Sequence, residues 1–239
     1  GIWIDRRGGR EPEVIVCETA PRNTAPALAA AATILREKDP EGLMLAMPAD
    51  HHIGDAEAFA ATVAKGRLAA EAGHLVTFGI APDRPETGYG YIEEGEPLDG
   101  LEEGRAVRRF LEKPERDVAE QLVAEGRYLW NSGIFLLPAG LLLEEMQAHA
   151  PDCAAASAQA VGAAKFGNGH IHLDGERFAE APDVSIDVAV MERTRRAAVV
   201  RADMAWSDSG TWPARRARPG PGATGNVRDG DAGAEDVDN

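Results

Sequence analysis

One aspartate stands where a strand-like run could hold it against a metal ion. Asp50 comes shortly after the apolar run 43–47, which Pro48 ends. A carboxylate held rigidly at the end of a strand could bind a divalent cation. Asp50 could equally close an Asx turn after the proline. The adjacent His51 and His52 lack the spacing to a cysteine or a third histidine that a metal site requires, so we interpret them as loop residues.

Four further stretches place polar residues beside glycine or proline, where a ligand could bind. They are TGYGYI at 87–92, FLEKP at 110–114, WNSGIF at 130–135 and WSDSGTW at 206–212. Each also has a purely structural interpretation. The first could be a tight turn, the second an exposed Glu112–Lys113 salt pair, and the third a bulge where Gly133 lets two backbones approach. The last could be a helix start that Asp208 or Ser209 caps.

The overall charge narrows the class of partner. The 239 residues carry a formal net charge of −15, which argues against a nucleic-acid backbone or an anionic membrane surface as the main partner. A small anionic ligand is still compatible with this charge, because a local group of cations or a bound metal ion can reverse the field inside a cleft. No apolar run reaches the roughly 18 to 20 residues that span a bilayer.

The composition indicates a folded chain with reduced thiols. Hydrophobic residues make up 44% of the sequence, which is enough to bury a sizeable core. The two cysteines, Cys17 and Cys153, form no metal or redox motif. Cys17 lies inside an apolar run, where we expect a buried, reduced thiol. A cytoplasmic location follows from this use of cysteine.

Strand-like and helix-like segments alternate along the chain. Strands are predicted at 14–17, 43–47, 74–80, 106–113, 132–138 and 197–202, and helices at 25–38, 56–73, 115–126, 139–150 and 186–194. Thr24, Asp55 and Ser185 are the predicted helix caps. This alternation predicts an α/β domain with a largely parallel sheet. Ligands of such sheets bind beyond the carboxyl ends of the strands, and Asp50 would lie there, at the end of a central strand.

The character of the sequence changes at Pro213. Residues 213–239 are rich in Gly, Pro and charge and show no helical or strand period, so we predict a flexible linker or tail there and a single domain over 1–212. The acidic stretch from Asp229 does not match a calcium-binding loop, because its sixth position is Ala234 and not glycine.

Taken together and in order, the motifs resemble one enzyme family. RNTAPALAAAA, LAMPADHHI, ETGYGYI, FLEKP, WNSGIF, SIDVAVME and WSDSGTW run from about residue 14 to 212. In this order they are similar to the mannose-1-phosphate guanylyltransferases, a branch of the sugar-phosphate nucleotidylyltransferases. The resemblance implies a Rossmann-like nucleotidylyltransferase fold with a mostly parallel mixed sheet. It also implies that GTP and mannose 1-phosphate react to give GDP-mannose and pyrophosphate.

The resemblance assigns roles to particular residues. It implies that Mg²⁺ is the cofactor and that Asp50 and Asp208 are its ligands, while Lys113 contacts the phosphate of the sugar phosphate. The residues expected around the sugar are Tyr89, Gly90, Glu112, Asn131 and Asp187. For Asp187, a carboxylate in the first turn of a helix is an equally good interpretation. The loop expected to face the guanine nucleotide contains Arg22, Asn23 and Thr24, just before a helix N-terminus.

The sequence departs from the family pattern at its N-terminal end. The family begins with a strand and a Gly-rich loop that wraps the triphosphate, and no such loop precedes Val14. We therefore expect a catalytic domain that lacks its first strand. Two alternatives stay open: a transferase for another sugar 1-phosphate, and a truncated domain that binds a nucleotide sugar without turnover. A homodimer is also left open.

Overall fold

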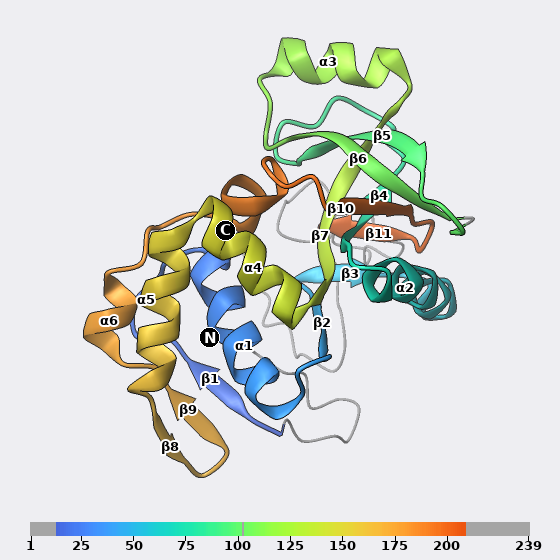
Figure 1. Cartoon of the computed structure of the whole chain (residues 1–239). Coiled ribbons are helices and arrows are strands. Elements are labelled where there is room, and N and C mark those ends of the chain that lie inside the picture. The colour runs from blue at the N-terminus through green and yellow to red at the C-terminus, as the bar shows by residue number, and fades with distance from the viewer. Residues whose placement is uncertain (1–12, 102, 209–239) are drawn as a thin grey trace, which may run out of the picture.

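A six-stranded mixed sheet forms the core of the molecule. The computed structural model describes residues 13–101 and 103–208, with this sheet at its centre (Figure 1). The strands follow the order β2–β7–β4–β10–β6–β5. They are β2 (Leu43–Ala46), β4 (Leu75–Ile80), β5 (Tyr91–Pro97), β6 (Gly104–Leu111), β7 (Tyr128–Pro138) and β10 (Ala197–Arg201). Helices separate most of these strands in the chain, which confirms the predicted α/β class. The predicted tail at 213–239 lies outside the described residues.

The sheet is less parallel than predicted. Among its described pairs, β10–β4 is parallel and the others are antiparallel. Two strands cause this: β7 runs opposite to its neighbours β2 and β4, and β6 runs opposite to its neighbours β10 and β5. The expectation that Asp50 follows a central strand is also wrong. Within the described part of the chain β2 pairs with β7 alone and therefore lies at the edge of the sheet.

The long strand β7 also closes the sheet on itself. Its residues 128–130 pair with β5, and residues 130–136 pair with β4. The strands therefore form a closed series. In it β7 pairs with β4, β4 with β10, β10 with β6, β6 with β5, and β5 with β7 again. The pairing with β4 shifts register between Thr77 and Gly79, and Gly133 has a φ of 70°. This irregularity agrees with the interpretation of WNSGIF as a bulge at Gly133. Asn131 lies where β7 leaves β5 and joins β4.

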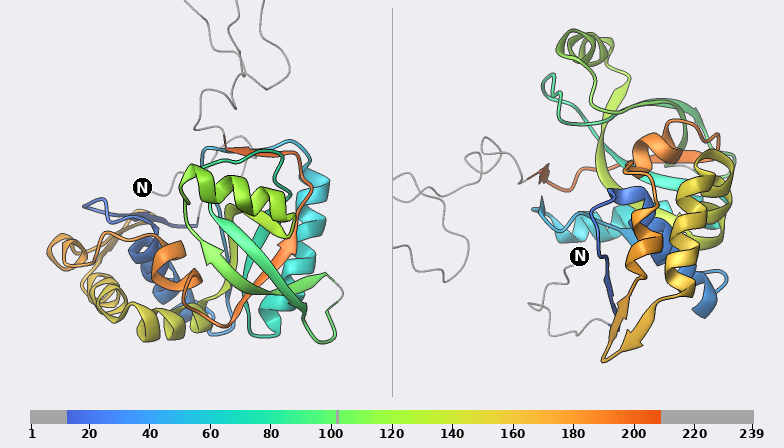
Figure 2. Two further views of the ribbon diagram at one scale, coloured as in Figure 1. Left: turned by 90° about the horizontal axis from the view of Figure 1, so that it is seen from above. Right: turned by 90° about the vertical axis from the view of Figure 1, so that its left-hand side faces the viewer.

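Apolar side chains alternate along the central strands, so both faces of the sheet are buried. Leu75, Phe135 and Val199 belong to one apolar cluster, whereas their neighbours belong to the other. Helices α1 (Thr24–Lys38) and α4 (Ala139–His149) cover the first face, and α2 (Ala56–Glu71) covers the second, as the views in Figure 2 show. Burial on both faces explains why these strands read as nearly continuous apolar runs in the sequence. Within residues 13–101 and 103–208, no helix has the length and apolar character needed to cross a membrane.

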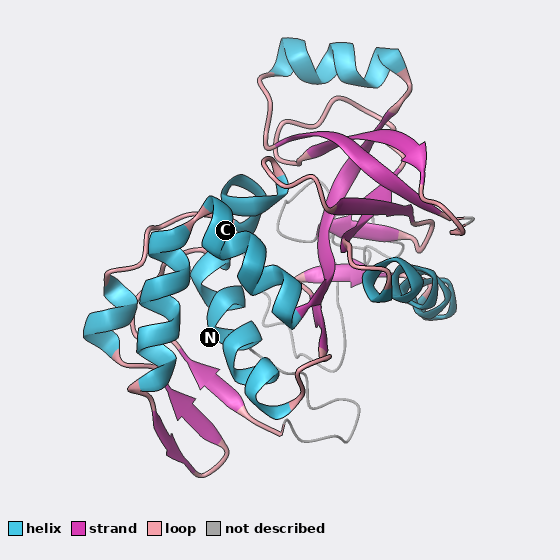
Figure 3. Cartoon of the chain, viewed as in Figure 1, coloured by secondary structure: helices cyan, strands magenta, loops and turns pink. Residues whose placement is uncertain are grey.

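A smaller layer packs beside α1, away from the main sheet (Figure 3). It contains α5 (Pro151–Gly162), α6 (Gly175–Ala179) and the strands β1 (Ile15–Cys17), β8 (Lys165–Gly167) and β9 (His170–His172). Of these elements the sequence predicted β1 alone. Cys17 is partly exposed, contrary to expectation, and among the described residues its strand β1 pairs with β9 alone.

Two short strands form a separate pair next to the main sheet. They are β3 (His51–Ile53) and β11 (Trp206–Asp208), and they run antiparallel. Both lie in stretches predicted to be a loop or a helix start. At three residues each, they are too short to show a period in the sequence, and their pairing joins segments about 155 residues apart.

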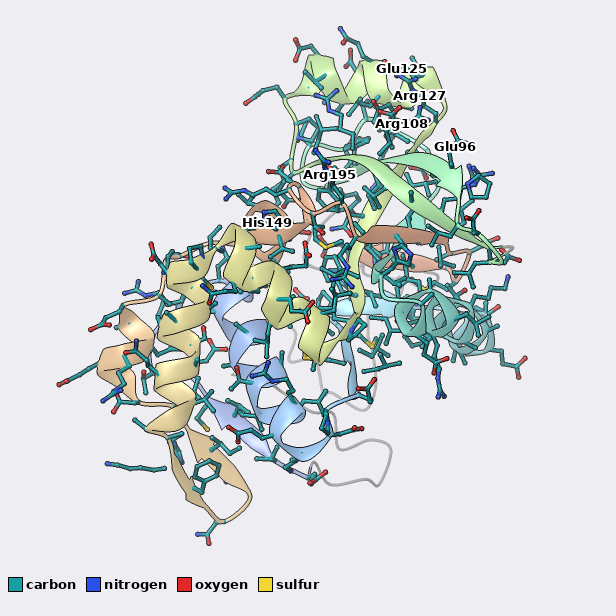
Figure 4. The ribbon with its side chains drawn as sticks, viewed as in Figure 1. Glu96, Arg108, Glu125, Arg127, His149 and Arg195 are labelled. Atoms are coloured by element: carbon teal, nitrogen blue, oxygen red, sulfur yellow. The ribbon has the colours of Figure 1, made fainter. Side chains whose placement is uncertain are left out.

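A lobe formed by β5, β6 and α3 (Arg116–Glu125) carries a group of paired charges. Figure 4 labels four of them, Glu96, Arg108, Glu125 and Arg127. Arg108 lies 3.2 Å from Glu96, and Arg127 lies 2.7 Å from Glu125. Both arginines also approach the buried Glu93, at 3.5 and 3.6 Å. Arg108 and Arg127 thus have carboxylate partners within the lobe, which makes these two cations poor candidates for binding a phosphate.

A Gly79→Ala substitution tests the packing where β7 changes partner. The added Cβ would lie 2.5 Å from Leu129 Cδ1 and 2.9 Å from Val199 Cγ2, so buried side chains or the sheet itself must shift. We expect the free energy of unfolding to fall by about 2–3 kcal/mol, measured by urea unfolding. Gly162→Ala is the matched control, because nothing lies within 4 Å of its added Cβ and alanine favours helix. Equal stability of the two variants would contradict the close packing at Gly79.

Candidate active site

The β3–β11 pair brings Asp208 opposite His51. The register aligns Asp208 with His51, and Asp208 Oδ1 lies 4.0 Å from His51 Nε2. Trp206 Nε1 donates a hydrogen bond to His51 Nδ1 at 3.2 Å, and the two rings meet edge to face. An indole N–H can only donate, so Nδ1 of His51 is an acceptor here. His51 is therefore a fixed part of the site and not the plain loop residue that the sequence suggested.

Both predicted metal ligands act on the same imidazole. Burial lowers the pKa of His51, and the carboxylates of Asp208 and then Asp50 oppose that change. Asp50 precedes His51 directly in the chain, whereas Asp208 reaches the ring from the opposite strand of the pair. The β3–β11 pairing thus brings Asp208 to the segment that begins just after Asp50, and a metal ion shared by the two carboxylates stays a prediction.

Two carboxylates suit a Mg²⁺ site better than a structural metal site, in which protein side chains supply all the ligands. No group of three or more His, Cys, Asp or Glu within the described ranges could hold a metal ion. A structural zinc site needs four such ligands. Mg²⁺ prefers oxygen ligands and often takes only one or two carboxylates, with waters and substrate phosphates completing its shell. A two-carboxylate site of this kind is compatible with Mg²⁺ that a phosphate substrate also binds.

Tyr89 links this carboxylate pair to the predicted sugar pocket. Its ring packs edge to face against Trp206 and Trp130, with centroids 5.3 and 5.2 Å away. Burial raises the pKa of the Tyr89 hydroxyl, and the charge of Asp208 raises it further. Tyr89 precedes Gly90, so one turn reaches both regions. The sequence predicted a contact at Tyr89 but not its packing against two tryptophans.

Gly90 leaves room for the carboxylate of Glu112. A Cβ at Gly90 would lie 2.8 Å from Glu112 Oε2 and 3.2 Å from Asn131 Cβ. The Gly90 carbonyl accepts a hydrogen bond from the backbone N–H of Asn131 at 2.8 Å. Three residues that the sequence assigned to the sugar pocket are therefore neighbours in the structure, although they come from three separate segments.

Lys113 follows Glu112 in a turn just beyond β6. Its φ is 45°, a conformation that side-chain-bearing residues seldom adopt. Its Nζ lies 3.3 Å from Glu112 Oε1, and its side chain is 63% exposed. The exposed ammonium can therefore reach an incoming phosphate without first leaving a buried ion pair. The backbone strain at this position is consistent with a functional site.

Asn131 is the hydrogen-bonding centre of the predicted pocket. Its Oδ1 accepts a hydrogen bond from Thr77 Oγ1 at 2.8 Å, and its Nδ2 donates to Asp187 Oδ1 at 2.8 Å. Asn131 and Thr77 are buried. These contacts fix which end of the amide is oxygen and which is nitrogen. The sequence analysis missed Thr77, although a hydroxyl in the apolar run 75–80 was a signal that could have revealed it.

Asp187 lies in a short π-helical turn, η2 (Asp187–Met191), and not in the longer α-helix that the sequence predicted. Ser185 Oγ accepts a hydrogen bond from Val188 N at 3.3 Å, which confirms the predicted cap. Burial raises the pKa of Asp187 to about 6, and the nearby charge of Glu112 adds to this. The carboxylate is thus held against Asn131 at an electrostatic cost.

This cost predicts a pH-dependent stability change for Asp187→Asn. The folded chain binds the Asp187 proton more tightly than the unfolded chain, so this group makes the free energy of unfolding fall as pH rises from about 4 to about 6. An asparagine can still accept the hydrogen bond from Asn131. We expect the free energy of unfolding of the variant to exceed that of wild type by about 1–2 kcal/mol at pH 7.5 and to differ little at pH 4. Urea unfolding at both pH values measures this difference. Asp183→Asn, an exposed change nearby, is the control, and an equal gain at both pH values would contradict the raised pKa.

The loop before α1 is anchored to the segment that carries Asp187. Asn23 caps α1 in place of the predicted Thr24, because its Oδ1 accepts a hydrogen bond from Thr24 N at 2.9 Å. Thr24 Oγ1 accepts one from Ile186 N at 2.9 Å. The Arg22 guanidinium donates from Nε and Nη2 to the Ala179 carbonyl, at 3.1 and 2.5 Å. Arg22 therefore has a structural partner, and its contact with a nucleotide stays a prediction.

Comparison with known proteins agrees with this arrangement. The family model of the nucleotidyl transferases matches residues 9–216. The mannose-1-phosphate guanylyltransferase of Escherichia coli is 47% identical over 223 residues, which are 92% of this chain and 47% of that protein. The enzyme of the same name from Salmonella typhimurium is 45% identical over 95% of this chain and 48% of its own length. The chain thus spans about half the length of the curated relatives it matches.

Solved structures support the fold. A structure from Thermus thermophilus, described as mannose-1-phosphate geranyltransferase, superposes with a TM-score of 0.72 at 34% identity, over 83% of this chain and 56% of that one. A Helicobacter pylori structure described as mannose-6-phosphate isomerase gives a TM-score of 0.73 at 33% identity, over 82% of this chain and 74% of that one. With a family model that covers most of the described residues, this chain belongs to the nucleotidyl transferase family.

Proposed function

We propose that this chain transfers GMP from GTP to mannose 1-phosphate, releasing pyrophosphate and forming GDP-mannose, with Mg²⁺ as the cofactor. The observation that carries the proposal is the convergence of Gly90, Glu112, Asn131 and Asp187 beside the exposed Lys113. Polar groups that can bind sugar hydroxyls thus lie next to one cation that can bind a sugar phosphate. The names and identities of the curated relatives point to mannose 1-phosphate and guanine.

The chemistry needs positioning more than reactive side chains. A phosphate oxygen of mannose 1-phosphate attacks the α-phosphorus of GTP in line, and the bond to the pyrophosphate oxygen breaks with its electron pair leaving on pyrophosphate. Glu112 and Asn131 would orient the sugar, and Lys113 would hold its phosphate as a point charge. When bound, Mg²⁺ would neutralise phosphate oxygens, and Asp50 and Asp208 are the residues that would hold it.

The fixed pocket explains how the attacking oxygen would be aimed. Asn131 cannot rotate freely, because Thr77 and Asp187 hold its two ends. Glu112 lies against Gly90, so the sugar would meet groups that are already in place. Preorganisation of this kind lowers the entropy lost on reaching the transition state. The loop of Arg22, Asn23 and Thr24 would face the nucleotide, since Thr24 contacts the same segment as Asp187.

Pyrophosphate release tests the proposal. The chain is incubated with Mg²⁺, mannose 1-phosphate and each of GTP, ATP, UTP and CTP in turn, and glucose 1-phosphate replaces the mannose compound in a parallel series. Release with GTP and mannose 1-phosphate is the expected result. Release with another nucleotide or sugar would favour a different sugar-1-phosphate transferase. Binding of GDP-mannose without any release would favour a non-catalytic domain.

A further inference from the structure

We propose that Glu192 is a positioning residue that holds the Glu112–Lys113 turn in its binding geometry, an inference that rests on the proposed function for its ligand. Glu192 Oε1 accepts a hydrogen bond from the Glu112 backbone N–H at 3.0 Å. The two residues are 80 positions apart in the sequence. Glu192 is the last residue of the SIDVAVME motif, but it was not among the predicted site residues.

The Glu112 amide needs a partner because β6 has ended. The strand finishes at Leu111, and Glu112 lies one residue beyond it. A backbone N–H that leaves a ladder must bond water or another acceptor, and this choice sets the path of the chain. Here a carboxylate accepts it, and hydrogen bonds to an ionised acceptor are stronger than those between neutral groups. The bond thus fixes the start of a turn in which Lys113 has a φ of 45°.

The π-helical turn places this acceptor. Glu192 follows η2 directly, and its N–H bonds the Asp187 carbonyl at 2.9 Å, five residues back. An α-helical turn would instead pair residues four apart and rotate the two carboxylates relative to each other. Single π turns occur often at functional sites. In this chain, one such turn presents Asp187 to Asn131 and Glu192 to Glu112.

One turn therefore connects both walls of the predicted sugar pocket. Asp187 receives a hydrogen bond from Asn131 on β7, and Glu192 receives one from Glu112 at the end of β6. The arrangement places three carboxylates near each other, and the charge of Glu192 contributes to the raised pKa of Glu112, after burial as the main cause. Holding like charges together is unfavourable, so the geometry must be stabilised by these directed hydrogen bonds.

Two substitutions separate the acceptor from the charge. Glu192→Ala removes the acceptor, whereas Glu192→Gln keeps an oxygen at the same place without the charge. We expect the Glu112 amide to exchange with solvent about tenfold faster in Glu192→Ala than in wild type, measured by ¹⁵N NMR. Glu192→Gln should keep the wild-type rate. Glu71→Ala, which removes an exposed carboxylate paired with Arg67 on α2, is the matched control.

Ligand binding supplies the second measurement. By calorimetry, mannose 1-phosphate should bind Glu192→Ala about tenfold more weakly than wild type, with GTP affinity unchanged. Glu192→Gln should restore the sugar-phosphate affinity. An unchanged exchange rate of the Glu112 amide in Glu192→Ala would overturn the inference, as would an equal loss of affinity for both substrates. If wild type binds no mannose 1-phosphate, the proposed function fails, while the exchange rate of the Glu112 amide still decides the role of Glu192.

Discussion

Replacing Asp208 by asparagine is expected to lower kcat/KM for pyrophosphate release by about a thousandfold. The substitution keeps the size of the side chain and one of its oxygens but removes the negative charge. Asp208 lies opposite His51 in the β3–β11 pair and acts electrostatically on Tyr89 as well. A carboxylate in that place would share a cation with the substrate phosphates, whereas a neutral amide binds Mg²⁺ far more weakly.

The measurement is steady-state release at several Mg²⁺ concentrations. The variant should also need a higher Mg²⁺ concentration than wild type to reach half of its own maximal rate. Its thermal unfolding midpoint should stay close to that of wild type. Asp99→Asn, an exposed change in the β5–β6 loop, controls for the loss of one negative charge. Full activity of Asp208→Asn at low Mg²⁺ would remove Asp208 from the proposed ligands. Asp50→Asn, tested in the same way, shows whether the two carboxylates act together.

Much of the fold could be predicted because several elements are continuous apolar runs or carry clear caps. The apolar runs that became β2, β4 and β10 agree with the predicted strands within one or two residues. The cap of α2 is also confirmed, since Asp55 Oδ1 accepts a hydrogen bond from Ala58 N at 2.9 Å. Burial and capping are local properties, so a single sequence contains the information that determines them.

Pairing between distant strands could not be predicted in the same way. The sequence contains no local signal that β7 would run between β2 and β4 and also pair with β5. That choice depends on long-range contacts, and it made the sheet more antiparallel than the alternation of elements suggested. The turn η2 is a similar case, because SIDVAVME has an ordinary helical pattern and contains no local signal of the wider π turn.

The site residues show the same division. The motifs located Gly90, Glu112 and Asn131, and the structure brings all three together. The contacts that hold them come from residues without a motif, such as Thr77, whose hydroxyl bonds the Asn131 amide. For Arg22 the nucleotide contact stays a prediction, and the sequence did not show that its guanidinium bonds the Ala179 carbonyl. Side-chain partners of this kind depend on the tertiary fold.

A Gly90→Ala variant is expected to raise the KM for mannose 1-phosphate by about a hundredfold while leaving the KM for GTP nearly unchanged. The new methyl group would lie 2.8 Å from Glu112 Oε2, 3.2 Å from Asn131 Cβ and 3.3 Å from Phe110 Cε1. The Glu112 carboxylate can rotate away at low cost, so the fold should survive. Its new position would no longer match the sugar hydroxyl that we expect it to bind.

Gly88→Ala provides the matched control for this prediction. Gly88 lies two residues earlier in the same turn, and the nearest atom to its added Cβ is Glu86 Oε1 at an ordinary 3.5 Å. Neither glycine has a positive φ, so both substitutions are compatible with the backbone and differ mainly in where the methyl group points. Steady-state kinetics, with mannose 1-phosphate and GTP varied separately, should therefore show a raised KM for mannose 1-phosphate in the Gly90 variant alone. If both variants lose sugar-phosphate affinity equally, the turn as a whole matters and Glu112 is not the group that Gly90 accommodates.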